Sequence, residues 1–301
     1  MWFRAIPEDW KEVVTNQEYW RQEEIYAGFA IELAAADLTK VSQLAKHFAD
    51  LPPVCQKQFL AQLASEEVVK LPEAERAPIW STLVDLISKH KRHSSAPWAL
   101  QLDRLEELSA VVAELAPRDP FVLYQRLFSN DDFDLFDGEG DDYEAQQTEL
   151  QGRRQAAIKE ISAAGLTAVV GFAGVVESPW QVGLALGSIA SDVDTDAALL
   201  PSMLDSDASL RDSFLYGYVS ARFQASGMPW VEQLKIEAWA PSQIGQFFTF
   251  LPFSPDVWRS VSEFLGEDES PYWTRTFANA YQTNGALELA VDKLLKYERP
   301  V

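Results

Sequence analysis

The sequence is poor in sulfur and in histidine. It contains one cysteine, Cys55, and three histidines among 301 residues. A single cysteine cannot form an internal disulfide, and so few cysteine and histidine ligands argue against a structural zinc site. We therefore expect a protein of a reducing, cytoplasmic environment that holds no metal and no cofactor.

Long hydrophobic runs are also missing. The longest strongly apolar stretch covers residues 166–176 and is interrupted by Gly171 and Gly174. It is too short to span a bilayer, which takes about 20 residues. The first nine residues lack the basic-then-apolar order of a signal peptide. We expect the apolar stretch to form a buried helix, and we expect no membrane partner.

Basic charge is scarce as well. The chain has 25 Lys and Arg against 46 Asp and Glu, which gives a net charge of −21. Nucleic-acid binding needs a basic face, so no nucleic-acid partner is expected. The one compact basic run, residues 89–93, follows an amphipathic pattern, where the C-terminal dipole of a helix favours cations. A hydrophobic content of 47% indicates a large core and excludes a disordered chain.

Standard catalytic motifs are absent. No glycine precedes a lysine, no histidine begins a His-Glu-x-x-His, and there is no Gly-x-Ser-x-Gly. We therefore predict a protein that is not an enzyme and has no catalytic residue. Paired carboxylates carry no motif, so an all-α barrel hydrolase acting on carbohydrate stays open as an alternative, and a structural spacer is another. The tryptophans that fall within helical patterns are expected to pack in the core; they are Trp80, Trp230, Trp239, Trp258 and Trp273.

What the chain does contain is apolar residues at steps of three and four, the period of one helix face. Three such runs are Leu102, Leu105, Leu108, Val111, Val112 and Leu115; Ile79, Trp80, Leu83, Val84, Leu86 and Ile87; and Ile25, Tyr26, Phe29 and Leu33. Alternation at period two is nearly absent, although residues 246–251 could form a short strand. The pattern predicts an all-α protein.

The second half repeats its helix signals. Ser178, Ser254 and Ser270 each precede a proline, as a capping hydroxyl precedes the first helical position. The expected starts are Pro179, Thr195, Asp207, Pro229, Pro241, Pro255, Pro271 and Ala286, and the expected stops are Gly227, Gly266 and Gly285. Alternate starts at residues 179, 207, 241 and 271 lie 28, 34 and 30 residues apart. This spacing predicts a right-handed α-solenoid of antiparallel helical hairpins, a divergent HEAT- or TPR-like array. The similarity of residues 223–227 to residues 281–285 supports a repeat.

One segment differs in composition from the rest. Residues 131–144 hold eight acidic residues and no basic one: Asp131, Asp132, Asp134, Asp137, Glu139, Asp141, Asp142 and Glu144. Like charges repel, so we expect a solvated loop over residues 129–145, between an N-terminal helical block (1–128) and the repeat region (146–301). An EF-hand register with Gly138 at its sixth position fails, because Phe133 and Leu135 cannot ligate Ca²⁺. The aromatic residues in the segment favour a docking site for a basic protein surface.

Two groups of packing motifs extend over most of the chain. Tyr272-Trp273 opens one pattern that ends in Leu294-Leu295 and Arg299-Pro300, and Pro78-Ile79-Trp80 is followed by Trp98-Ala99-Leu100 and Pro117-Arg118-Asp119-Pro120. These phrases resemble the α-helical repeat regions of very large bacterial multidomain proteins, some of which are conflict or defence sensors. The resemblance implies a partner-recognising solenoid and carries over no catalytic residue.

The sequence as a whole therefore predicts a non-catalytic protein–protein interaction or scaffold module. We expect its partner to be a protein with a basic surface, met by a concave helical surface and by the acidic segment. The chain ends after an expected helix without a polar capping repeat, so we also expect it to be a piece of a longer protein.

Overall fold

The computed structural model describes residues 17–132, 135, 142–191, 193–204 and 209–299. The protein is all-α, with 75% helix and no strand in the described ranges, so the predicted fold class is confirmed at this level. Most of the segment that could have formed a strand lies in helix α15 (Pro241–Thr249). No helix of the described ranges is long and apolar enough to cross a membrane. The chain divides into two compact units, which we call unit 1 (residues 1–123 and 131–148) and unit 2 (residues 124–130 and 149–301).

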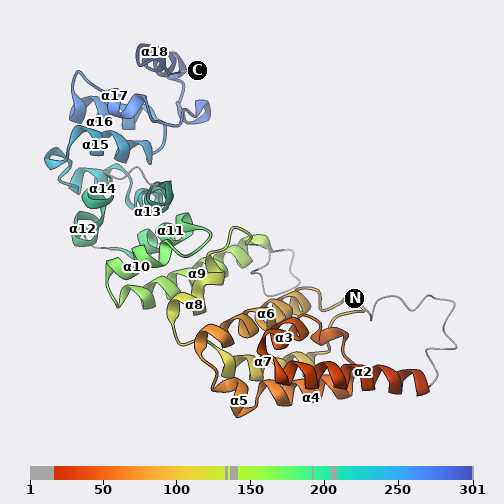
Figure 1. The fold of residues 1–301 in the computed structure, drawn as a ribbon. Coiled ribbons are helices and arrows are strands. Elements are labelled where there is room, and N and C mark those ends of the chain that lie inside the picture. The colour runs from red at the N-terminus through yellow and green to blue at the C-terminus, as the bar shows by residue number, and fades with distance from the viewer. Residues whose placement is uncertain (1–16, 133–134, 136–141, 192, 205–208, 300–301) are drawn as a thin grey trace. The chain divides into compact units, whose positions relative to one another are not determined.

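Unit 1 is built around the predicted amphipathic helices. Its elements are α2 (Gln17–Ala36), α3 (Leu38–Ala45), η2 (Phe48–Asp50), α4 (Pro53–Leu63), α5 (Glu66–Val69), α6 (Glu73–Arg92) and α7 (Leu102–Leu115). Helix α7 packs on α4 and α6, and α2 packs on α3 and α4 (Figure 1). Leu105, Leu108 and Leu115 of α7 are buried, as their spacing predicts, whereas Leu102 is exposed.

Helix α2 buries a different face from the predicted one. Ile25, Tyr26, Phe29 and Leu33 form the apolar run in the sequence, and their side chains are 49–67% exposed. The small residues Ala27 and Ala34, together with Ile31, are the buried ones. They lie roughly on the opposite side of the helix, and their size allows α2 to approach α3 and α4 closely.

Unit 2 follows the predicted helix starts closely. Its elements are η3 (Gln125–Phe128), α10 (Leu166–Ala173), α11 (Pro179–Ile189), α12 (Val193–Met203), α13 (Ser209–Ser226), α14 (Met228–Gln233), η5 (Ile236–Ala238), α15, α16 (Pro255–Leu265), α17 (Ser270–Trp273), η6 (Ala280–Gln282) and α18 (Leu287–Lys296). Two further helices cross the unit boundary along the chain, α8 (Pro120–Tyr124) and α9 (Tyr143–Ser162). The starts at Pro179, Pro241 and Pro255 are confirmed; Asp207 lies outside the described residues.

The capping chemistry of these starts differs from the prediction. Ser178 and Ser254 occupy the N-cap positions of α11 and α16, but neither side chain makes a capping hydrogen bond. Ser270 is the first residue of α17, whose N-cap is Glu269. The glycine stops are confirmed where helices end: Gly227 follows α13 and Gly266 follows α16, both with positive φ.

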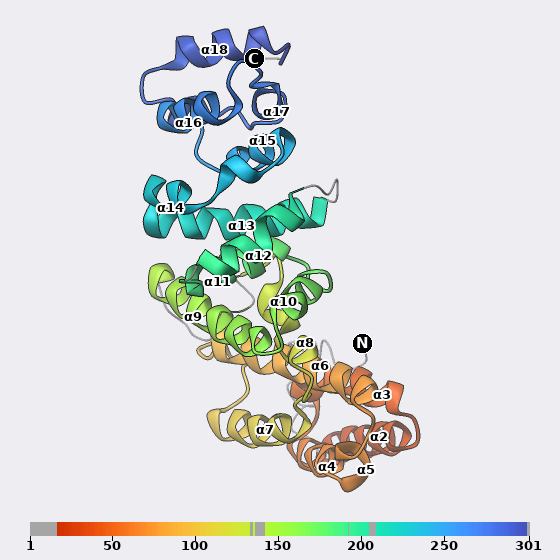
Figure 2. The same ribbon diagram turned by 90° about the vertical axis from the view of Figure 1, so that its left-hand side faces the viewer.

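The closest helix pair in unit 2 is α11 with α13, and α13 in turn contacts α14 (Figure 2). Glycines permit this approach. A Cβ at Gly183 of α11 would fall on the carbonyl oxygen of Phe214, and one at Gly217 of α13 would fall on that of Trp180. The backbones therefore meet where no side chain fits, which fixes the rotation of α13 about its axis.

Candidate functional site: a pocket in unit 2

The acidic segment is described only in part. Asp134, Asp137, Glu139 and Asp141 lie outside the described residues. Asp131 and Glu144 are exposed, and Asp132 is half-buried. Asp142 is exposed and caps helix α9, because its Oδ1 accepts a hydrogen bond from the N–H of Ala145 at 3.0 Å. The last residues of the segment thus begin a helix, where their negative charge suits the N-terminal dipole.

The basic run ends helix α6, as predicted. Lys89, Lys91 and Arg92 lie in its last turn, where cations interact favourably with the dipole. His90 is buried, and its Nδ1 accepts a hydrogen bond from the N–H of Leu100 at 3.0 Å. Burial is the main reason that the pKa of His90 lies below its ordinary value. This histidine connects α6 to the chain that leads into α7.

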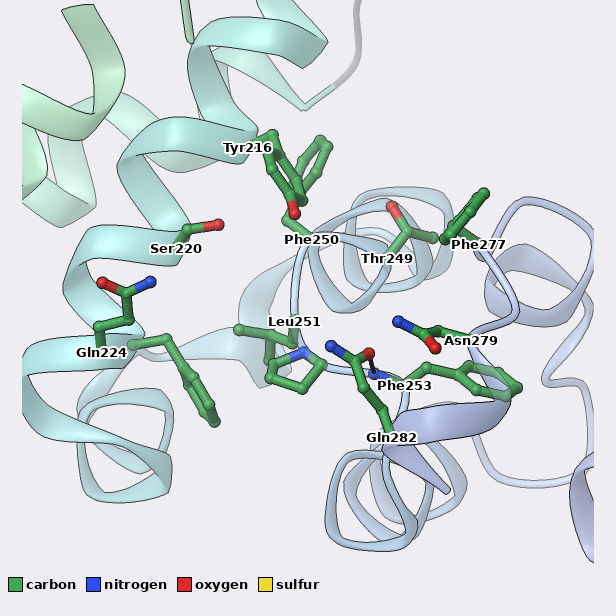
Figure 3. A pocket seen from close by; sticks show the side chains of 12 residues that line it. Tyr216, Ser220, Gln224, Thr249, Phe250, Leu251, Phe253, Phe277, Asn279 and Gln282 are labelled. Atoms are coloured by element: carbon green, nitrogen blue, oxygen red, sulfur yellow. Dashed lines mark hydrogen bonds between the residues drawn. The ribbon is translucent and has the colours of Figure 1, made fainter. Parts of the chain in front are cut away.

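A pocket with a volume of about 270 Å³ lies in unit 2 (Figure 3). Its lining comes from α13, from the end of α15 and the turn that follows, and from the segment between α17 and α18. The lining residues are Tyr216, Ser220, Phe223, Gln224, Thr249, Phe250, Leu251, Pro252, Phe253, Phe277, Asn279 and Gln282. All twelve are uncharged, in a chain of net charge −21.

One wall of the pocket is a single face of α13. Tyr216, Ser220, Phe223 and Gln224 are spaced by four, three and one residues, so they project from the same side of the helix. The remaining faces of α13 are buried against α11 and α14, through residues such as Phe214. The packing of α13 therefore determines which residues face the pocket.

The opposite wall carries two carboxamides with fixed orientations. The Oδ1 of Asn279 accepts a hydrogen bond from the N–H of Tyr281 at 3.0 Å, which caps η6. The Oε1 of Gln282 accepts one from the N–H of Phe253 at 2.9 Å. Figure 3 shows both amide nitrogens turned toward the α13 side of the pocket. Because each oxygen already accepts a main-chain hydrogen bond, these side chains present N–H donors to the pocket.

The floor of the pocket belongs to the aromatic core of unit 2. Phe250, Leu251 and Phe253 are buried. The ring of Phe253 lies 4.8 Å from that of Trp258 and 5.9 Å from that of Trp273, between centroids. Aromatic contacts at these distances stabilise the fold beyond their buried area. The floor is therefore rigidly supported from below, and the core positions predicted for these two tryptophans are confirmed.

Two exposed aromatic residues line the pocket: Phe277, which is 81% exposed, and Tyr216 on α13, which is 49% exposed. Tyr281 on η6, next to the lining residue Gln282 in the sequence, is 99% exposed. Single exposed apolar residues are common on protein surfaces, whereas exposed apolar residues that gather at one place mark interaction sites. Tyr and Phe in such positions are typical of sites that bind another molecule.

A buried ion pair holds the α13 wall in place. Asp196 of α12 is fully buried and accepts hydrogen bonds from the Tyr218 hydroxyl at 2.6 Å and the Trp230 indole at 2.9 Å. It also accepts from Nε and Nη2 of Arg222, at 3.1 and 2.8 Å. Tyr218 and Arg222 lie on α13 and Trp230 on α14, so one carboxylate connects three helices.

A second buried carboxylate, Glu269, connects α16, α17 and α18. It accepts hydrogen bonds from Ser262 and Trp273 and from Lys293, whose Nζ lies 2.7 Å from Oε1. Burial alone would raise the pKa of Glu269, but these hydrogen bonds outweigh burial and hold the pKa below its usual value. The negative charge of Glu269 therefore stabilises the packing of these three helices.

The pocket residues carry no motif that marks them as a site in the sequence. The similarity of residues 223–227 to residues 281–285, which we interpret as a sign of a repeat, involves three of them. The two glutamines of these segments, Gln224 and Gln282, line the same pocket from different elements. The paired segments therefore supply two walls of one site, in addition to any repeat relationship.

The polar side-chain groups that line the pocket are hydroxyls and carboxamides. The described lining has no carboxylate, histidine or cysteine, so it offers no residues for a two-carboxylate hydrolysis. The part of the chain that the structure describes contains no cluster of His, Cys, Asp and Glu that could hold a metal ion. The chain matches no protein family, no curated protein and no solved structure.

Proposed function

We propose that this chain is a non-catalytic protein-binding module and that the unit 2 pocket is its binding site. The observation that carries the proposal is an uncharged pocket lined by the exposed aromatic residues Phe277 and Tyr216, with the exposed Tyr281 next to the lining residue Gln282 in the sequence. Aromatic side chains at a rim bury a large area on binding and lose little conformational freedom. The pocket, at about 270 Å³, is slightly smaller than small-molecule sites, which measure about 300–1,000 Å³, so it suits one short stretch of a protein partner.

The helical arrangement supports the same function. In unit 2 the helices that begin at Pro179, Ser209, Pro241 and Ser270 are spaced as in an array of helical hairpins. We regard unit 2 as a divergent solenoid, in which the pocket lies between α13, α15 and the segment before α18. Solenoids commonly bind extended partner segments on the surface that successive hairpins form.

Selection of peptides from a random heptapeptide display library tests this proposal. We expect the unmodified chain to enrich a set of peptides that the Phe277→Ala, Tyr281→Ala double variant does not retain. The two side chains are exposed, so their removal leaves the fold intact. Leu295→Ala on α18, also exposed and outside the pocket, is the matched control and should retain the peptides. Equal enrichment by the double variant would show that the binding site lies elsewhere.

The acidic segment supports a second contribution, steering of a basic partner. Eight carboxylates within 14 residues create a local negative potential that raises association rates at low salt. We expect tetralysine to shift the amide NMR signals of Asp131 and Glu144 at low salt, and the shifts to disappear at high salt. A variant with Asn or Gln at positions 131, 132, 134, 137, 139 and 141 should lose them, while Asp142 is kept because it caps α9. Shifts spread evenly over the surface would contradict a local docking site.

A further inference from the structure

The pocket shows an asymmetry in its hydrogen-bonding groups. The oxygens of Asn279 and Gln282 each accept a main-chain N–H of this chain, so their NH₂ groups remain for a ligand. The two carboxamides therefore present oriented donors, and a ligand group that meets them must be an acceptor.

We propose that these two carboxamides bind main-chain carbonyl groups of an extended, uncharged peptide segment of the partner. This inference rests on the proposed function and specifies what the pocket recognises. Peptide carbonyls are strong neutral acceptors. In an extended strand, successive side chains point to opposite sides, so one apolar side chain can enter the pocket while a neighbouring carbonyl meets the donors.

Anionic ligands fit the pocket poorly. A carboxylate or phosphate would also accept hydrogen bonds from Asn279 and Gln282. Its charge, however, would enter a site whose described lining contains no Lys, Arg or His, in a chain of net charge −21. Moving a charge out of water without a partner charge is unfavourable. A neutral carbonyl carries no such cost.

Sugars fit the wall less well than peptides. A sugar hydroxyl both donates and accepts, and a pair of neighbouring hydroxyls is best met by a carboxamide or carboxylate whose oxygen has both lone pairs free. The oxygens of Asn279 and Gln282 already use one lone pair each, for the N–H groups of Tyr281 and Phe253. The floor formed by Phe250, Leu251 and Phe253 matches an apolar side chain. The geometry therefore favours a peptide that is apolar at the residue entering the pocket.

Isosteric substitution separates carbonyl recognition from simple apolar contact. Asn279→Asp and Gln282→Glu each keep an oxygen that can accept the same main-chain N–H, so the local fold is preserved. Each variant replaces an NH₂ donor with a negatively charged oxygen, which repels a carbonyl. Gln233→Glu, which adds the same charge at an exposed position of α14 outside the pocket, is the matched control.

The probe is the same heptapeptide display library, with near-UV circular dichroism to verify the fold of each variant. We expect uncharged, apolar heptapeptides to be enriched by the unmodified chain and by Gln233→Glu. Asn279→Asp and Gln282→Glu should each retain at least tenfold fewer display particles. As a second probe, cellopentaose and chitopentaose are expected to cause no shift of the side-chain NH₂ signals of Asn279 and Gln282 in NMR spectra.

The possible outcomes distinguish the two proposals. If Phe277→Ala, Tyr281→Ala abolishes retention and the isosteric variants do not reduce it, carbonyl recognition is wrong and the protein-binding function stands. If the alanine double variant also retains the peptides, the pocket is not the binding site. Enrichment of acidic or basic heptapeptides, or NH₂ shifts caused by either oligosaccharide, would overturn the ligand class.

Discussion

Asp196 offers the sharpest test of how the fold supports the site. We expect Asp196→Ala to destabilise unit 2 strongly, because it leaves the buried guanidinium of Arg222 without its counter-charge. It also leaves the Tyr218 hydroxyl and the Trp230 indole without their acceptor. Removing one partner of a buried ion pair typically costs about 3–5 kcal/mol. With a urea dependence of about 3 kcal/mol/M, this corresponds to a midpoint lower by roughly 1–1.7 M.

The assay is urea unfolding followed by circular dichroism at 222 nm. Asp194→Ala is the matched control, because Asp194 lies on the same helix but is exposed, and its removal should leave the midpoint nearly unchanged. The double variant Asp196→Leu, Arg222→Met removes both charges and should recover the part of the lost stability that comes from the unpaired charge, while Tyr218 and Trp230 still lack their acceptor. A midpoint shift for Asp196→Ala as small as that of Asp194→Ala would refute the reasoning, as would a double variant less stable than either single variant.

Three further outcomes follow from packing and from the pKa shifts. Gly183→Ala on α11 should lower the urea midpoint, because α13 leaves no space for a methyl group. Gly152→Ala on α9 is the contrasting variant: the space around Gly152 is open, and alanine should raise the free energy of unfolding by up to about 1 kcal/mol. The pKa of Glu269 lies below its ordinary value, so its stabilising effect is complete above about pH 4.3 and is lost as the pH falls through the folded-state pKa. In urea titrations at several pH values, Glu269→Gln should be less stable than the unmodified chain at pH 7, with a gap that narrows on acidification. The pKa of His90 is lowered mainly by burial, so the unfolded state binds a proton more readily than the folded state. The stability of unit 1 should therefore fall as the pH drops below about 6.5. Hydrogen exchange in unit 1 should show this loss of stability, and in the His90→Gln variant this pH dependence should be absent.

The helices of unit 2 show which structural features local residue preferences predict and which they do not. The preference for proline at the first helical position and for glycine after the last one depends only on φ and on the missing proline N–H. Pro241 and Pro255 therefore correctly predicted the starts of α15 and α16, and Gly266 correctly predicted the end of α16. The hydroxyl capping expected at Ser178 and Ser254 depends on where the side chain points, and the structure shows no such bond. Helix α2 shows the same limit, because its most hydrophobic face is exposed and its alanine-containing face is buried.

The sequence by itself determined the class of the fold, most helix boundaries and the absence of familiar catalytic motifs, because these depend on local period, backbone restriction and residue type. Only the tertiary structure decided the site. Gln224 and Gln282 are 58 residues apart in the sequence, and they line one pocket. The position of α13 in it is fixed by glycine contacts with α11 and by Asp196, which connects α13 to α12 and α14. The donor character of Asn279 and Gln282 likewise arises from hydrogen bonds that only the folded chain can form. Such side-chain orientation depends on packing between distant segments, which residue spacing alone does not encode.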